Sequence, residues 1–97
     1  MMDELTFFER MLFAIRRDDA AEIVRILRAD RSLVHATDPN FSTPLHFAAA
    51  EGSLKALETL LGWGADINAI NRIGRTPLCV AAVEGEIPTM TLLLQKG

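Results

Sequence analysis

The sequence predicts an all-α solenoid, in which helix–turn–helix units stack side by side and extended arms with tight turns connect them. Residues of the same type recur about 33 positions apart, as in a repeat protein. Between these recurring positions, the apolar residues follow a helical period. The segments that separate the helical patterns are polar and carry asparagine and glycine, which favour turns.

The first helix of each unit is predicted by a segment that occurs twice, "TPLHFAAAEG" at 43–52 and "TPLCVAAVEG" at 76–85. The opening threonine can cap a helix through its hydroxyl, and the proline that follows suits the first helical turn. The central alanines allow a second helix to approach closely. Gly52 and Gly85 end the helix where a left-handed backbone is needed, which glycine adopts at little cost.

A second helix follows each of these segments, in "SLKALETLLGWG" and "EIPTMTLLLQKG". Pro88 falls in the first turn of the latter and need not break the helix. Four apolar residues of each helix are expected on its packing face: Leu54, Leu57, Leu60 and Leu61 in the first copy, and Ile87, Met90, Leu93 and Leu94 in the second.

The connecting segment "ADINAINRIGRTP", residues 65–77, has no helical period. It predicts an extended arm with a tight turn around 71–74. The corresponding segment "VHATDPNFSTP" places Phe41 where Gly74 stands. Because phenylalanine lacks the conformational freedom of glycine, we expect the first arm to form a different turn.

A weaker copy precedes these two units. "LFAIRRDDAAEIVRIL" at 12–27 aligns with "HFAAAEGSLKALETLL" at 46–61, and Asp18 and Asp19 replace the glycine between the helices. Its first helix is expected to extend further toward the N-terminus, because an apolar stripe begins at Leu5. We interpret this unit as a divergent or capping repeat, which repeat arrays need for solubility.

The run "TPLHFAAAEGSLKALETLLGWGADINAINRIGRTPL" resembles the ankyrin repeat family over its whole length, and the resemblance extends across 12–97. It implies an ankyrin-repeat solenoid that binds proteins, with no named partner. It also implies that His46 is a structural hydrogen bonder that ties one repeat to the next; Cys79 replaces it in the last unit. We expect one domain, 1–97, with a divergent repeat or cap at 1–34, a second repeat at 35–67 and an uncapped third repeat at 68–97.

Composition excludes several function classes. The net charge of -3 gives no general attraction to nucleic acid or to anionic lipid, so neither is expected as a partner. No apolar run approaches the roughly 18 residues that a membrane span needs. Asp3 and Glu4 stand where a secretory signal carries positive charge, and the single cysteine fits a reducing compartment. A cytoplasmic or nuclear location is therefore expected.

No constellation of residues predicts catalysis, a metal or a cofactor, so the chain is not expected to be an enzyme. His46 and Cys79 occupy equivalent positions one repeat apart, too far for a shared metal or a nucleophile–base pair. Asp18, Asp19 and Glu22 could be viewed as catalytic carboxylates. The simpler interpretation is that acidic residues favour a helix N-terminus.

The resemblance also implies that a partner protein docks on the concave face formed by the turn tips and the short helices. Phe41, Ile70 and Ile73 are large apolar groups at tips that should be polar, and an exposed apolar patch marks an interaction site. The alternative for Phe41 and Ile73 is burial between neighbouring arms. The remaining candidates are Arg72 and Arg75 at the tips, Arg16, Arg17, Glu51, Val83 and Glu84 on the short helices, and Trp63 as a second contact.

The last helix lacks the polar replacements that a terminal cap should show. Met90, Leu92 and Leu94 are therefore candidates for self-association or for docking within a longer array. Two functional classes follow from the sequence. The first is a protein-binding adaptor module, and the second is a structural or regulatory segment of a larger protein or homo-oligomer.

Overall fold

The computed structural model describes residues 6–97, so Asp3, Glu4 and Leu5 lie outside the described residues. The elements pair into three successive helical hairpins, and no strand occurs between residues 6 and 97. The helices are α1 (Phe7–Arg16), α2 (Ala20–Ala29), α3 (Pro44–Glu51), α4 (Leu54–Gly62), α5 (Pro77–Glu84) and α6 (Ile87–Lys96), with a short 3-10 helix η1 (Arg31–His35) after α2.

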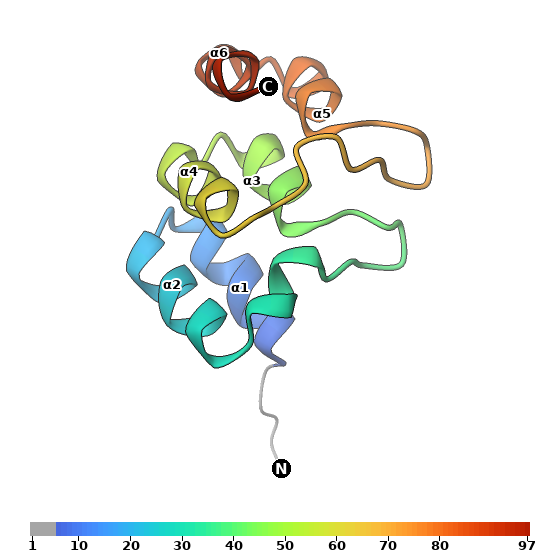
Figure 1. Cartoon of the computed structure of the whole chain (residues 1–97). Helices are drawn as coiled ribbons and strands as arrows, with labels where there is room; N and C mark the ends of the chain where they lie inside the picture. The colour runs from blue at the N-terminus through green and yellow to red at the C-terminus, as the bar shows by residue number, and fades with distance from the viewer. Residues whose placement is uncertain (1–5) are drawn as a thin grey trace.

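The hairpins stack in chain order into a small solenoid, as the repeat predicts. Figure 1 shows α1, α3 and α5 in one row and α2, α4 and α6 in a second row, with the two arms projecting on the side of the first row. Contacts run from α1 to α3 and from α3 to α5, and likewise from α2 to α4 and from α4 to α6. We call α1, α3 and α5 the inner helices.

The helix ends confirm the roles predicted for the repeated threonine and glycine. The Thr43 hydroxyl accepts a hydrogen bond from the His46 N–H, and the Thr76 hydroxyl accepts one from the Cys79 N–H. Gly52 ends α3 at φ 70° and is in the left-handed region that favours glycine. A Cβ at this position would also lie 2.8 Å from Cδ of Glu86, so the next repeat packs directly against the glycine.

The first hairpin reaches the same shape with different residues. Thr6 and Glu9 form a capping box, and α1 has ten residues where α3 has eight. Asp18 adopts φ 54°, the conformation that Gly52 supplies in the next unit. Its carboxylate accepts a hydrogen bond of 2.8 Å from the Ala56 N–H at the start of α4, which offsets the cost of the left-handed backbone. This aspartate therefore holds the first two repeats together.

The core runs between the two rows and along the stack. Ala48 and Ala49 are fully buried, as their role in close helix approach predicts. The prediction that Leu54 and Ile87 lie on the packing face is wrong, since both are exposed. Each is the first residue of its helix, one turn before the buried stripe. That stripe is formed in α4 by Ala56, Leu57 and Leu60.

The sequence prediction missed η1. Asp30 caps it by accepting from the Ser32 N–H, and Val34 is its buried residue. The first connection is therefore a 3-10 turn followed by an arm. The Asp30–Ser32 pair is the signal in the sequence that could have revealed this turn.

Candidate functional site

The tips of the two arms have the same hydrogen-bonding pattern. In the first arm, one carboxylate oxygen of Asp38 accepts from the N–H groups of Asn40 and Ser42, both at 2.9 Å. In the second arm, the side-chain oxygen of Asn71 accepts from the N–H groups of Ile73 and Arg75 at 3.2 and 3.0 Å. Each tip is therefore organised by one side chain that satisfies two backbone donors.

The expectation that Phe41 produces a different turn is wrong. Phe41 adopts φ 60° and its N–H donates to the Asp38 carbonyl at 2.9 Å, while Gly74 adopts φ 79° and donates to the Asn71 carbonyl at 2.9 Å. A bulky residue is rarely left-handed, and the conformation costs about 1–2 kcal/mol. The hydrogen bonds to Asp38 hold Phe41 in a backbone conformation that glycine would adopt without strain.

Arg72 joins the two arms. Its backbone N–H donates to the Asn40 carbonyl at 2.7 Å, and its guanidinium donates to the Pro39 carbonyl at 3.0 Å. The guanidinium also lies over the Phe41 ring, 4.8 Å from the ring centre, in a cation–π contact. The sequence prediction placed Arg72 at the arm tips as a partner contact and missed this clamp, which depends on residues about 33 positions apart.

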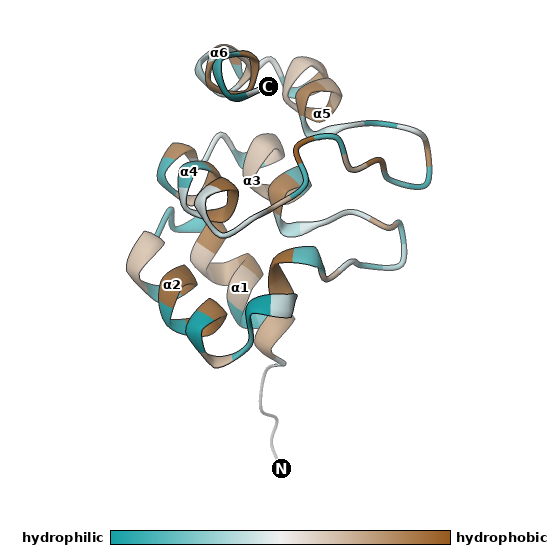
Figure 2. Cartoon of the chain, in the orientation of Figure 1, coloured by the Kyte–Doolittle hydropathy of each residue, from teal (hydrophilic) through white to brown (hydrophobic). Residues whose placement is uncertain are grey.

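The arm tips are apolar and solvent-exposed. Phe41, Ile70 and Ile73 expose 54%, 62% and 68% of their surface, so burial between the arms does not occur. Figure 2 shows hydrophobic segments interrupting the otherwise hydrophilic arm between α4 and α5. A hollow of about 170 Å³ lies between the arms, with Asn40, Ser42, Asn71, Arg72 and Ile73 around it. We call Phe41, Ile70, Arg72, Ile73 and Arg75 the arm-tip patch.

Four predicted residues lie on the inner helices beyond the arms. Arg16 and Glu51 form an ion pair between repeats, with 3.7 Å from the guanidinium Nε to a carboxylate oxygen. Val83 is 60% exposed, and Glu84 next to it is exposed. Glu51 and Glu84 are the last residues of α3 and α5, so they lie at the helix ends farthest along the chain from the arms.

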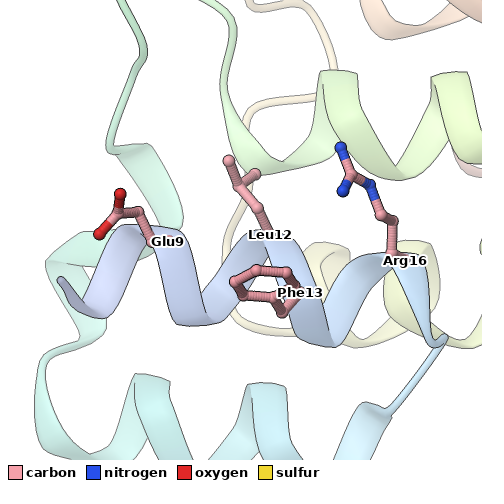
Figure 3. A pocket seen from close by; sticks show the side chains of 4 residues that line it. All are labelled: Glu9, Leu12, Phe13 and Arg16. Atoms are coloured by element: carbon pink, nitrogen blue, oxygen red, sulfur yellow. The ribbon is translucent and has the colours of Figure 1, made fainter. Parts of the chain in front are cut away.

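A second hollow lies on α1, about 200 Å³ in volume and lined by Glu9, Leu12, Phe13 and Arg16. Figure 3 shows the side chains of Leu12 and Arg16 extending toward the neighbouring inner helix, with the ring of Phe13 across α1. Phe13 is about half exposed. The sequence prediction identified Arg16 here and missed Phe13, although its place one turn before Arg16 on the helix was a usable signal.

Two predicted residues lie apart from the arm-tip patch. Arg17 lines a hollow between α1 and α2, together with Arg10, Phe13, Ala14, Asp19 and Glu22. Trp63 was predicted as a second contact because its position, just after a helix, is usually exposed; this expectation of exposure is wrong, since Trp63 is half-buried against the core. The Arg31 guanidinium covers its ring at 5.5 Å from the ring centre. Trp63 therefore fastens the end of α4 to η1.

The polar residues considered for chemistry have structural partners. His46 is buried; its Nδ1 accepts from the Thr43 N–H at 3.0 Å, so Nε2 carries the proton and donates to the Arg75 carbonyl at 2.9 Å. This confirms the tie between repeats. Asp19 caps α2 by accepting from the Glu22 N–H, and Glu22 pairs with Arg25. Among residues 6–97, no three His, Cys, Asp or Glu side chains group closely enough to hold a metal ion.

Cys79 is exposed at the position that corresponds to His46. The Thr76 hydroxyl donates to its sulfur at 3.3 Å, and this hydrogen bond is the main reason that the pKa of the thiol is lowered. A further hydrogen bond to the Thr76 backbone and the positive charge of Arg75 lower the pKa as well. Cys79 therefore forms a thiolate more readily than an ordinary exposed cysteine.

The C-terminal end of the stack has an exposed apolar face. Leu94 is 64% exposed, as a residue proposed for self-association should be, although its helical spacing had placed it on the packing face; Met90 and Leu92 are half-buried. A hollow of about 230 Å³ opens here, lined by Ile67, Asn68, Thr76, Leu78, Leu93, Leu94 and Gly97. In the second repeat, the residues equivalent to Leu78 and Met90 are Leu45 and Leu57, and both are fully buried.

No helix within the described range is long and apolar enough to cross a membrane. A family model described as ankyrin repeats, in three copies, matches residues 11–97.

Several curated proteins are similar to this chain. It is 41% identical to the serine/threonine-protein kinase VIK of Arabidopsis thaliana over 87 residues, which cover 90% of this chain and 20% of the kinase. It is 38% identical to the probable E3 ubiquitin-protein ligase XBOS33 of Oryza sativa subsp. japonica, covering 89% of this chain and 17% of the ligase. It is 47% identical to the ARF GTPase-activating protein Git of Drosophila melanogaster over 57 residues, which cover 53% of this chain and 8% of that protein. The chain thus spans a fifth or less of the length of these relatives.

Proposed function

We propose a protein-binding function for this chain, which belongs to the ankyrin repeat family. Ankyrin repeats are general protein–protein interaction modules. The proposed docking strip consists of the arm-tip patch together with Arg16, Glu51, Val83 and Glu84 on the inner helices. A segment of a partner protein lies along this strip, in contact with the arm tips.

One observation carries the proposal: three large apolar side chains are exposed beside two arginines on arms that are held in place. Exposed apolar groups next to arginine are typical of interface cores and their rims. The Arg72 clamp and the Asp38 and Asn71 turns fix the backbone of the tips. The tips therefore lose little conformational entropy when a partner binds. The left-handed Phe41 also fits a functional role, because backbone strain is concentrated at such sites.

The test is a triple variant in which Ile70, Ile73 and Arg75 are each replaced by serine. All three side chains are exposed and none makes an ion pair within the described range, so the thermal midpoint should change little. Proteins captured from a lysate by the unaltered chain and by the variant are then quantified by mass spectrometry. A partner that binds the strip should be lost with the variant.

A matched control carries the same kinds of change away from the strip. Leu54→Ser, Ile87→Ser and Arg28→Ser alter two exposed apolar residues and one arginine on α4, α6 and α2. This control should retain the partner. Equal capture by the unaltered chain and the strip variant would show that the proposed surface is wrong.

The second candidate function is a structural or regulatory segment that docks through the C-terminal face of its third repeat, 68–97. The observation that favours it is that Leu94 is exposed and that Leu78 and Met90 are only half-buried, at positions that a following unit could cover. The N-terminal end is different: Arg10 pairs with Glu22 and Arg25 with Glu22, which fits a capping role for 1–34. The small share of each relative that the chain covers is consistent with a segment of a larger protein.

Sedimentation over a micromolar concentration range tests self-association through this face. Dimers that dissociate on Leu94→Lys, and persist in the Ile87→Lys control, would support it. A monomer at every concentration, with one sharp unfolding transition, would count against self-association.

The proposed setting is the cytoplasm or the nucleus, which the single free cysteine fits.

A further inference from the structure

The docking strip has opposite charge at its two ends. The tips carry Arg72 and Arg75 against one carboxylate, Asp38, one of whose oxygens accepts two backbone N–H groups. The far end carries Glu51 and Glu84, with Arg16 of α1 paired to Glu51, so Glu84 is the acidic residue there that no such pair neutralises. The chain as a whole has a net charge of -3, so its positive arm tips are a local exception.

The inner helices reinforce this polarity. α3 and α5 both begin directly after an arm, so their positive N-terminal ends face the arm side and their negative C-terminal ends coincide with Glu51 and Glu84. A carboxylate at a helix C-terminus is unfavourable for folding. Glu51 is compensated by Arg16, whereas Glu84 has no ion pair within residues 6–97. The stability of the helix therefore gives no reason for an acid at position 84.

The two arginines at the arm tips have hydrogen-bond donors available for a carboxylate. The guanidinium of Arg72 uses one of its five donors on Pro39 and rests on the Phe41 ring, so it is held while further donors remain. Arg75 is fixed through its backbone, which bonds to Asn71 and His46, and its guanidinium makes no ion pair within the described chain. The held guanidinium of Arg72 and the guanidinium of Arg75 both keep open donors, which favours bidentate pairing with carboxylates.

We infer that the strip selects a partner segment with separated charges: an acidic residue that pairs with Arg72 or Arg75, an apolar residue on the exposed isoleucines, and a basic residue that pairs with Glu84. This inference rests on the proposed function and adds the chemistry of the partner. The eight residues of α5 span about 12 Å. In an extended segment the acidic and basic residues are therefore about four positions apart.

The probe is a library of random dodecapeptides displayed on phage and selected on the whole 97-residue chain. Enriched peptides should carry an acidic and a basic residue about four positions apart, with an apolar residue between them. For the best peptide, fluorescence anisotropy should give a Kd about tenfold higher with Arg75→Ala and about threefold higher with Glu84→Ala. Arg28 and Glu58 are exposed on α2 and α4, away from the strip. Arg28→Ala and Glu58→Ala should therefore leave the Kd unchanged.

A charge exchange establishes direct pairing. Arg75→Glu should abolish binding of the selected peptide, and a peptide in which the acidic residue is replaced by lysine should recover it. Enrichment of uncharged peptides that lose affinity with Ile70→Ser and Ile73→Ser, but not with Arg75→Ala, would overturn this inference and leave the proposed function intact. Enrichment of no peptide, or of peptides insensitive to Ile70→Ser, Ile73→Ser, Arg75→Ala and Glu84→Ala, would overturn both.

Discussion

The second and third repeats carry nearly the same motif, yet their side chains are buried to different extents. Leu57 is fully buried in the second repeat, while Met90 at the same position of the third is only half-buried. His46 is buried and bridges two repeats, whereas Cys79 is exposed. The second repeat has a neighbour on both sides. Burial in this stack thus depends on the adjacent repeat as much as on the sequence of the repeat itself.

The largest effect is expected from paired truncations in α4 and α6. Leu57→Ala removes a fully buried side chain and should lower the free energy of unfolding by about 3 kcal/mol. Met90→Ala should cost about 1 kcal/mol, since part of that side chain already faces water. Urea denaturation followed by circular dichroism measures both. Equal costs would mean that the third repeat is as well covered as the second.

The next comparison concerns the bridge between repeats. His46→Ala leaves the Thr43 N–H and the Arg75 carbonyl without their partner and should cost about 2 kcal/mol. Cys79→Ala removes an exposed thiol and should change the free energy of unfolding by less than about 0.5 kcal/mol. The same urea titrations apply. A large loss with Cys79→Ala would show that the exposed position carries a structural role.

The two arm tips should differ in how much they depend on the side chain that organises them. Asp38→Ala should cost about 2 kcal/mol and Asn71→Ala about 1 kcal/mol, because Gly74 favours its turn and Phe41 opposes it. A double-mutant cycle checks the cause: adding Phe41→Gly should recover part of the loss in Asp38→Ala. No recovery would mean that the left-handed phenylalanine is not strained.

The smallest effect concerns the reactivity of Cys79. Its lowered pKa predicts that alkylation by iodoacetamide reaches half its maximal rate at a lower pH in the folded chain than in urea. Thr76→Val should move this midpoint upward more than Arg75→Ala, since the Thr76 hydroxyl is the main cause. Because the folded state favours the thiolate, stability should increase as the pH rises through the folded pKa. Identical midpoints in folded and unfolded chains would contradict this.

Much of the fold could be predicted from the sequence because it depends on local signals. The threonine caps, Gly52, Gly85 and the helical spacing of Leu57 and Leu60 act within one repeat, and each lies where it was expected. The long α1 and the exchange of glycine for Asp18 were also visible, since they change the same local pattern.

The candidate site was harder to predict because its geometry depends on contacts between repeats. The exposure of Ile70 and Ile73 followed from their place at a polar tip. The clamp by Arg72 required knowing that the arms lie side by side, and nothing local reveals it. The turn at Phe41 was misjudged because the hydrogen bonds to Asp38 outweigh the preference for glycine. Trp63 was misjudged because Arg31 covers it from the preceding repeat.

The most direct test of the docking strip is an amide chemical-shift map of the ¹⁵N-labelled chain titrated with the selected peptide. The proposed function predicts the largest shifts at 38–42 and 70–75, with smaller shifts at Glu51 and Glu84. The C-terminal face should remain unchanged. Shifts confined to Leu78, Met90 and Leu94 would contradict the proposed strip and favour docking through the third repeat.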